Sequence, residues 1–156
     1  MFTGCKVHII DFGFACSYLN KDGQHLDQLK TENFYGNLFY SSLNQLNFNS
    51  QSRRDDLISL SYMISSLLNE GKLNNLTLND QKSQVECFHA ILKAKQDMTI
   101  KEMCGNYHNS VNLRSFFEHV FSLNFKEEPD YERLQDLLQK FVEEDLNENC
   151  QCVRVP

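Results

Sequence analysis

The clearest candidate for chemistry is the triplet Asp11-Phe12-Gly13, which ends the short, mostly apolar run Val7-His8-Ile9-Ile10. An aspartate at the end of such a run either closes a turn or presents its carboxylate to a ligand. Gly13 would give the backbone the freedom that a tight turn after Asp11 needs. The triplet alone does not decide between these roles, so its meaning depends on the blocks that follow it.

A second polar block, Gln51-Ser52-Arg53-Arg54-Asp55-Asp56-Leu57, places two arginines beside two aspartates. It predicts a helix start, because the Ser52 hydroxyl can accept the amide of Asp55 while the Asp55 carboxylate reaches back to the amide of Ser52. A long helix should follow and stop at Gly71. Its apolar residues recur at helical spacing: Leu57, Leu60, Ile64, Leu67 and Leu68.

Three pairs of cysteine and histidine residues resemble fragments of metal sites: Cys5 with His8, Cys104 with His108, and Cys150 with Cys152. No two pairs share the spacing of a zinc module, so isolated thiols and imidazoles are the favoured interpretation. The six cysteines are spread along the chain, unlike a compact disulfide framework. Reduced thiols are therefore expected.

The elements that must position these residues are mostly helices. Residues 14–49 show no sustained periodicity, and an irregular segment this long inside a compact domain is usually functional. The side chains of Phe116, Phe117 and Phe121 share one helix face and are interpreted as core. The predicted elements are a strand at residues 6–10, a helical turn at 41–46, a helix at 80–95, a short turn at 99–103, a helix capped by Asn112, and a last helix capped by Asp130.

The composition is that of one soluble globular domain. A length of 156 residues suits a single domain, and 41% hydrophobic with 23% charged residues is typical of folded soluble proteins. The net charge of -6 argues against a nucleic-acid or anionic membrane surface, since both need clustered lysine and arginine. No apolar run approaches the roughly 18 residues of a membrane span, and no secretory pattern opens the chain. A cytoplasmic or nuclear location is expected.

Three blocks in one order resemble the casein kinase 1 family of serine/threonine protein kinases. Residues 9–15 resemble the family's I-I-D-F-G-L-A, residues 51–57 match Q-S-R-R-D-D-L, and residues 125–131 with Leu134 are similar to F-x-E-x-P-D-Y-x-x-L. The resemblance implies a mainly α fold, the C-terminal lobe of a protein kinase, with a short strand and activation segment before a central helix and flanking helices. Residues 1–146 would be a partial kinase domain, and residues 147–156 a flexible tail.

The resemblance also implies roles for particular residues. Asp11 would bind the Mg²⁺ that bridges the phosphates of ATP, with Phe12 and Gly13 setting its position beside the cofactor. Asp56 would hold the catalytic loop in place by accepting its backbone amides. Structural support would also come from Arg53 and Arg54, and the substrate loop would contain Gly36, Asn37 and Tyr40.

Several positions depart from the family pattern. Asn37 replaces a threonine that ties the substrate loop to the catalytic aspartate. Leu29 stands where the family has an arginine that pairs with acidic or phosphorylated substrates, and Lys30 beside it is only a partial substitute. Ser61 stands where a glycine is usual. The family's preference for acidic or primed substrates is therefore unsupported.

The largest departure is the lack of three catalytic parts in these 156 residues. They contain no glycine-rich loop, no phosphate-pairing lysine of the V-A-I-K kind and no catalytic loop of the H-R-D-x-x-x-x-N kind. By resemblance, the complete enzyme would use Mg²⁺ and ATP to phosphorylate serine or threonine hydroxyls of protein substrates. This chain alone is predicted to be inactive, as an incomplete gene product of such a kinase. The alternative is a noncatalytic, pseudokinase-type module that binds a protein partner.

Overall fold

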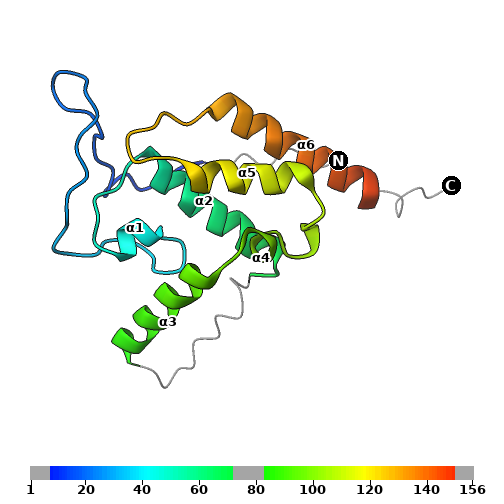
Figure 1. Cartoon of the computed structure of the whole chain (residues 1–156), viewed down its shortest axis with the longest axis horizontal. Coiled ribbons are helices and arrows are strands. Elements are labelled where there is room, and N and C mark those ends of the chain that lie inside the picture. Colours follow the sequence, from blue (N-terminus) through cyan, green and yellow to red (C-terminus); the bar gives the residue numbers. More distant parts are fainter. Residues whose placement is uncertain (1–7, 72–82, 150–156) are drawn as a thin grey trace.

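The computed structural model describes residues 8–71 and 83–149 of the chain, which are mainly helical, as the sequence predicted. None of the helices in these ranges is long and apolar enough to cross a membrane. The helices follow in this order (Figure 1): α1 (Leu43–Leu46), α2 (Arg53–Leu68), α3 (Gln84–Asp97), α4 (Ile100–Cys104), the short 3₁₀ helix η1 (Gly105–Tyr107), α5 (Val111–Ser122) and α6 (Tyr131–Asn149).

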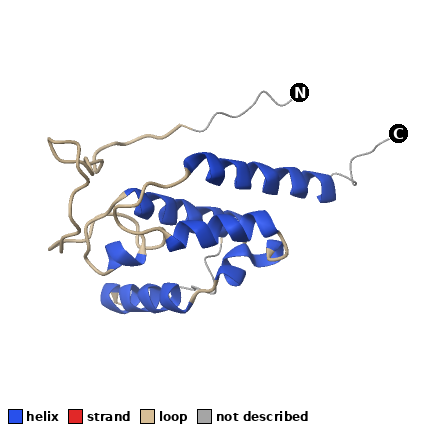
Figure 2. Ribbon diagram, turned by 45° about the horizontal axis from the view of Figure 1, so that its top comes forward, coloured by secondary structure: helices blue, strands red, loops and turns tan. Residues whose placement is uncertain are grey.

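The hydrophobic core lies where α5 passes between α2 and α6 (Figure 1). The predicted central helix, α2, packs against α4 and α5. Figure 2 shows these helices as one body, with the loops and turns that precede α1 at one end of it. The buried residues of the core are Ile58, Tyr62, Met103, Cys104, Leu113, Phe116, Phe117, Val120, Leu134 and Phe141.

Helix α5 packs into the core through an apolar stripe, of which one predicted residue is partly exposed. Phe116 and Phe117 are fully buried, as predicted for a core stripe. Phe121 is 37% exposed and meets the Tyr62 ring edge-on, with ring centroids 5.8 Å apart. The helix begins earlier than predicted, because the Ser110 hydroxyl rather than Asn112 caps it by accepting the amide of Leu113.

Capping boxes set the start of α2, α3 and α4. The predicted box of Ser52 and Asp55 is present at the start of α2. At the other end, the amide of Gly71, with φ of 80°, donates to Ser66 O at 2.7 Å and closes the helix. Ser83 with Glu86 starts α3 and Thr99 with Glu102 starts α4. Of the helix predicted at 80–95, residues 80–82 lie outside the described ranges.

The predicted strand is wrong in the part that the structure describes. Residues 8–10 pair with no neighbouring strand, and Ile9 and Ile10 are 82% and 80% exposed. A strand needs a second backbone to bond with, and propensity alone does not supply it. Residues 6 and 7 lie outside the described ranges. At the other end of the chain, α6 continues to Asn149, so the first residues of the predicted tail are helical.

We expect Phe117→Ala to lower the free energy of unfolding by about 3–5 kcal/mol, because the lost ring leaves a cavity in the core. Urea denaturation followed by circular dichroism measures this change. Val111→Ala is the control on the same helix, since Val111 is 70% exposed, and should change stability by less than about 0.5 kcal/mol. Equal effects of the two substitutions would contradict the placement of α5.

Candidate functional site

Asp11 lies on a tight turn that its own carboxylate stabilises. Its φ is 59°, in the left-handed region that aspartate tolerates better than most residues. Asp11 Oδ1 accepts the amide of Gly13 at 3.1 Å, and the next turn follows where Phe12 O accepts the amide of Ala15 at 3.0 Å. A Cβ at Gly13 would lie 3.1 Å from the same Oδ1, so glycine lets the carboxylate fold back over the turn. One carboxylate oxygen therefore serves the turn itself.

These residues do not form a complete magnesium site by themselves. Mg²⁺ requires near-octahedral coordination by oxygen atoms, and Asp11 supplies one carboxylate. Across residues 8–71 and 83–149, no group of three or more His, Cys, Asp or Glu side chains could hold a metal ion. Phe12, predicted to pack and set the position of Asp11, is 69% exposed. Asp11 could act only as one ligand among others supplied from elsewhere.

Asp55 is the buried acid of the α2 start. It is 1% exposed, and its carboxylate accepts hydrogen bonds from two parts of the chain. Oδ1 accepts Ser42 Oγ at 2.6 Å and Asn44 Nδ2 at 3.1 Å, while Oδ2 accepts the amide of Ser52 at 2.9 Å. The charge is thus satisfied by donors that also fix α1 against the start of α2.

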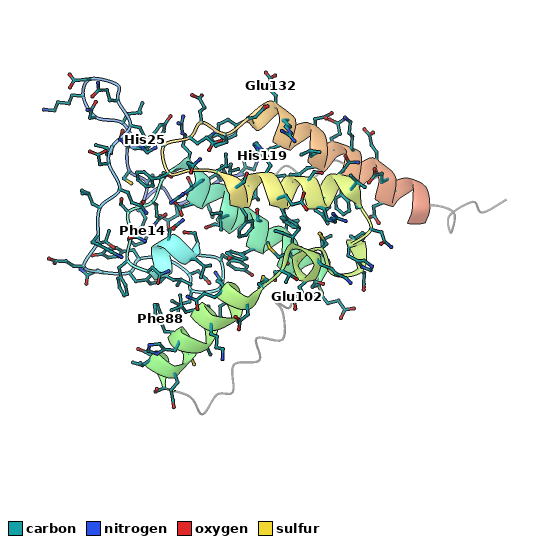
Figure 3. All side chains as sticks on the ribbon, viewed as in Figure 1. Phe14, His25, Phe88, Glu102, His119 and Glu132 are labelled. Carbon is teal, nitrogen blue, oxygen red and sulfur yellow. The ribbon has the colours of Figure 1, made fainter. Side chains whose placement is uncertain are left out.

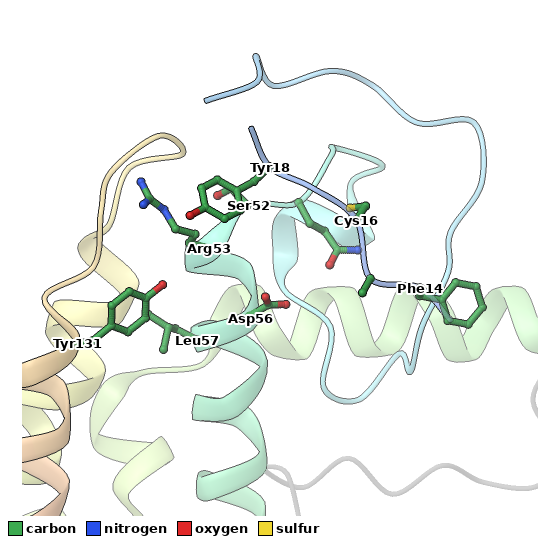
Figure 4. Close-up of a pocket in the computed structure, with 10 residues that line it drawn as sticks. Phe14, Cys16, Tyr18, Ser52, Arg53, Asp56, Leu57 and Tyr131 are labelled. Atoms are coloured by element: carbon green, nitrogen blue, oxygen red, sulfur yellow. The ribbon is translucent and has the colours of Figure 1, made fainter. Parts of the chain in front are cut away.

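Asp56 points into a pocket of about 400 Å³ beside α2 (Figure 4). Burial, and after it the charge of Asp55, raises the pKa of Asp56 above its usual value. No hydrogen bond or ion pair to Asp56 is found among the described residues. The lining residues come from the segment after Asp11, from the start of α2 and from the start of α6: Phe14, Ala15, Cys16, Tyr18, Gln51, Ser52, Arg53, Asp56, Leu57 and Tyr131.

The two arginines tie the start of α2 to the loop between α5 and α6. Arg53 donates to Lys126 O at 3.1 Å and pairs with Glu128 at 3.5 Å. Arg54 donates to Leu123 O at 3.2 Å. Because these partners are 69 and 73 residues away in sequence, the arginines join segments that would otherwise meet only through the core.

Contacts between aromatic rings around His25, which is labelled in Figure 3, extend this junction to the N-terminal segment. The His25 ring lies 5.5 Å from the Tyr18 ring and 5.2 Å from the Phe125 ring, measured between centroids. The Arg53 guanidinium lies 4.9 Å from the Tyr18 centroid, and the Arg54 guanidinium 5.5 Å from the Phe125 centroid. Tyr18 and His25 are therefore held against the start of α2 by tilted and edge-on ring contacts and by cation–π contacts.

The predicted substrate-loop residues fall in one turn before α1, the substrate-loop turn (residues 36–42). Asn37 Oδ1 accepts the amide of Phe39 at 2.8 Å, and Asn37 O accepts the Ser41 hydroxyl at 2.7 Å. Gly36 has a φ of 130°, and a Cβ there would lie 3.0 Å from Gln45 Nε2. The Asn37 side chain is therefore used within its own turn, and Tyr40 is 37% exposed.

The structure thus places the predicted residues in three groups. Asp11, Phe12 and Gly13 form an exposed turn, Arg53 and Asp56 border the pocket, and residues 36–42 form a turn held against α2 through Asp55. Asp11 does not line the pocket.

Two residues of this region were missed by sequence reasoning. Ser42, which donates to Asp55 and caps α1, carries the signal of a serine before a helical turn. Tyr131, the first residue of α6, lines the pocket and is 51% exposed. Its place just after the cap residue Asp130, in the first turn of the helix, could have suggested this.

Comparison with known proteins gives a consistent family name. No family model matches the chain. The chain is 33% identical over 135 residues to a probable casein kinase I homolog of Encephalitozoon cuniculi (strain GB-M1), which covers 86% of this chain and 42% of that relative. It is 35% identical over 134 residues to casein kinase I homolog 2 of Schizosaccharomyces pombe, which covers 84% of this chain and 29% of that relative. The chain spans less than half the length of either relative.

Replacement of each of the two adjacent aspartates by asparagine should change the free energy of unfolding by very different amounts. Asp55→Asn should lower the free energy of unfolding by about 2 kcal/mol, because buried donors lose a charged acceptor. Asp56→Asn should leave it unchanged or raise it slightly at pH 7. The raised pKa of Asp56 means that its ionisation opposes folding at neutral pH, and this penalty disappears at acid pH where the group is protonated in both states. Urea titrations of both variants at pH 7 measure the difference, and a larger loss for Asp56→Asn would contradict it.

Proposed function

Because the chain belongs to the casein kinase 1 family of serine/threonine protein kinases, we propose that it is the substrate-side helical lobe of such a kinase. In the complete enzyme, ATP with Mg²⁺ would supply the phosphoryl group that is transferred to a serine or threonine hydroxyl. Asp11 would provide one oxygen ligand for the ion, and the substrate-loop turn would lie on the same lobe. The fold supports this role, since α2, α4, α5 and α6 form a packed body without any contribution from Asp11.

The observation that carries the proposal is the unpaired Asp56 carboxylate in its pocket. A partly buried acid with a raised pKa is poised to accept hydrogen bonds from another segment. In the family, the equivalent aspartate accepts backbone amides of the catalytic loop. We assign the pocket beside Asp56 to that loop, so that binding would supply the missing donors and cover the apolar side chains of Phe14 and Leu57.

The chain alone would then lack most of what phosphoryl transfer requires. The reaction depends on positioning the two reactants and neutralising the developing charge. Asp11 is one metal ligand on an exposed turn, and nothing in the described residues provides a general base beside it. This lobe would serve as a platform whose chemistry depends on the remaining parts of a kinase domain.

A noncatalytic binding module is the second candidate, and the substrate-loop turn favours it. Asn37 stands where the family has a threonine that ties the loop to the catalytic aspartate, and its Oδ1 accepts the amide of Phe39, which directs the side chain into its own turn. Leu29, at the position of the family's substrate-pairing arginine, is 67% exposed and carries no charge. Both changes would be tolerated if the lobe only bound a protein partner.

Phosphate transfer by the purified chain and by a chimaera separates these candidates. The chimaera joins the part of the S. pombe relative that precedes its D-F-G triplet to residues 11–156 of this chain. With radiolabelled ATP, Mg²⁺ and a mixed serine/threonine peptide substrate, the chain alone should give no transfer above the protein-free blank. The chimaera should transfer phosphate, and Asp11→Ala should abolish that activity.

Two other outcomes of this assay would count against the kinase proposal. Transfer by the chain alone that Asp11→Ala removes would overturn the proposal. A chimaera that folds and binds ATP but transfers nothing would favour the noncatalytic module. Within an active chimaera, Asp56→Asn should lower kcat at least about tenfold while thermal stability is retained, since a loop anchor is lost rather than a core residue.

A further inference from the structure

A lysine is buried between α3, α2 and the substrate-loop turn without a carboxylate partner. Lys95, near the end of α3, is 3% exposed. Its Nζ donates a hydrogen bond to Ser41 O and lies 4.0 Å from the centroid of the Tyr62 ring. The ion pairs found within residues 8–71 and 83–149 do not include Lys95. A buried ammonium without an opposite charge is rare, because a carbonyl and an aromatic ring offset only part of its loss of hydration.

Lys95 connects α3, which has few other links to the lobe, to the substrate-loop turn and to α2. Ser41, its acceptor, is followed by Ser42, which donates to the buried Asp55 at the start of α2. Helix α3 itself packs mainly on α1 and lies at the edge of the lobe (Figure 1). An aromatic contact between Phe48 and Phe88, with centroids 6.2 Å apart, adds to the α3 attachment. Release of the Lys95 contact would therefore free α3 without opening the core of α2, α5 and α6.

The groups around Lys95 would stabilise a positive charge on its amine only in part. From α2, the Tyr62 ring faces the amine, and burial raises the pKa of its hydroxyl, so Tyr62 stays neutral. From the substrate-loop turn, Ser41 offers a neutral carbonyl, and the Asp55 carboxylate bonds to Ser42 instead. On α3 itself the titratable neighbours His89, Lys93 and Asp97 are exposed. Burial lowers the pKa of Lys95 to about 7.

We propose that Lys95 is a proton-controlled latch: the neutral amine holds α3 against the substrate-loop turn, and uptake of a proton drives the amine into water and releases α3. The latch is a property of the folded lobe and does not require phosphate transfer. If the proposed function also holds, the latch would control how firmly the substrate loop is held.

The direction of the pH effect follows from proton linkage. A lysine in water keeps its proton up to about pH 10.4, whereas Lys95 in the closed lobe gives it up at about pH 7. Between these values, opening takes up a proton, so the opening constant rises about tenfold for each unit that pH falls. Below about pH 7 the amine is charged in both states, and the opening constant becomes independent of pH.

Hydrogen exchange of the intact chain tests the release of α3. After correction for intrinsic rates, protection of the α3 amides and of residues 41–46 should rise between pH 7.0 and pH 8.5, by about 15-fold if the latch limits exchange. Lys95→Met removes the titrating amine at similar length, so its protection should be the same at both pH values. Lys93→Met, which changes an exposed lysine of the same helix, should follow the unaltered chain. An unaltered chain with pH-independent protection, or a pH effect retained in Lys95→Met, would overturn the proposal.

Competitive acetylation of the unaltered chain keeps the proposal testable if Lys95→Met does not fold. Exposed Lys93 should react about tenfold faster for each pH unit from 7 to 10, because its neutral fraction grows in that proportion. The acetylation rate of Lys95 should level off above about pH 7, since the closed amine is already neutral there. A Lys95 rate that keeps rising in parallel with Lys93 would show an ordinary ammonium and overturn the latch.

Discussion

The arrangement of this lobe depends on the buried carboxylate of Asp55. Its hydrogen bonds to Ser42, Asn44 and Ser52 hold α1 and the start of α2 in one fixed relation. Successive residues of a helix point about 100° apart, so fixing Asp55 inward also fixes its neighbours. Arg54 is thereby turned toward the loop between α5 and α6, and Asp56 toward the pocket.

That geometry divides the lobe into a packed body and an exposed segment. The body is stabilised by Phe116 and Phe117 of α5 and by Tyr62, which are buried between helices. The exposed segment carries Asp11 and is attached through rings and cations around His25 rather than through a core. Four of its apolar side chains, Ile9, Ile10, Phe12 and Phe14, are each more than two-thirds exposed. Exposed apolar residues gathered in this way are characteristic of surfaces that are covered by another element.

The helices could be predicted from sequence because their signals are local. Capping residues such as Ser52, Ser83 and Thr99 act within one turn, and the stripe of α5 requires only a periodicity of about 3.6 residues. The strand could not be predicted in the same way, since residues 8–10 need a partner strand to become one. Three sequence blocks carried the resemblance to the casein kinase 1 family, and the curated relatives confirm that family.

The different roles of Asp55 and Asp56 could be predicted only in part from the sequence. The capping box explained one bond of Asp55, but its bond to Ser42 crosses from another segment and depends on tertiary structure. Lys95 is a similar case. It lies on the face of α3 that also carries Phe88 and Ile91, where spacing predicts an apolar residue, yet burial of its amine becomes evident only when Tyr62 and Ser41 are placed around it.

In this structure a folded helical lobe carries Asp11 on an exposed segment that has no core of its own. Backbone ¹⁵N order parameters measured for the whole chain, with and without ATP and Mg²⁺, test it most directly. We expect values of about 0.85 in α2 and α5, and values below about 0.6 for residues 11–14 that do not rise when ATP and Mg²⁺ are added. Residues 11–14 as rigid as α5, or made rigid by ATP and Mg²⁺, would contradict the claim.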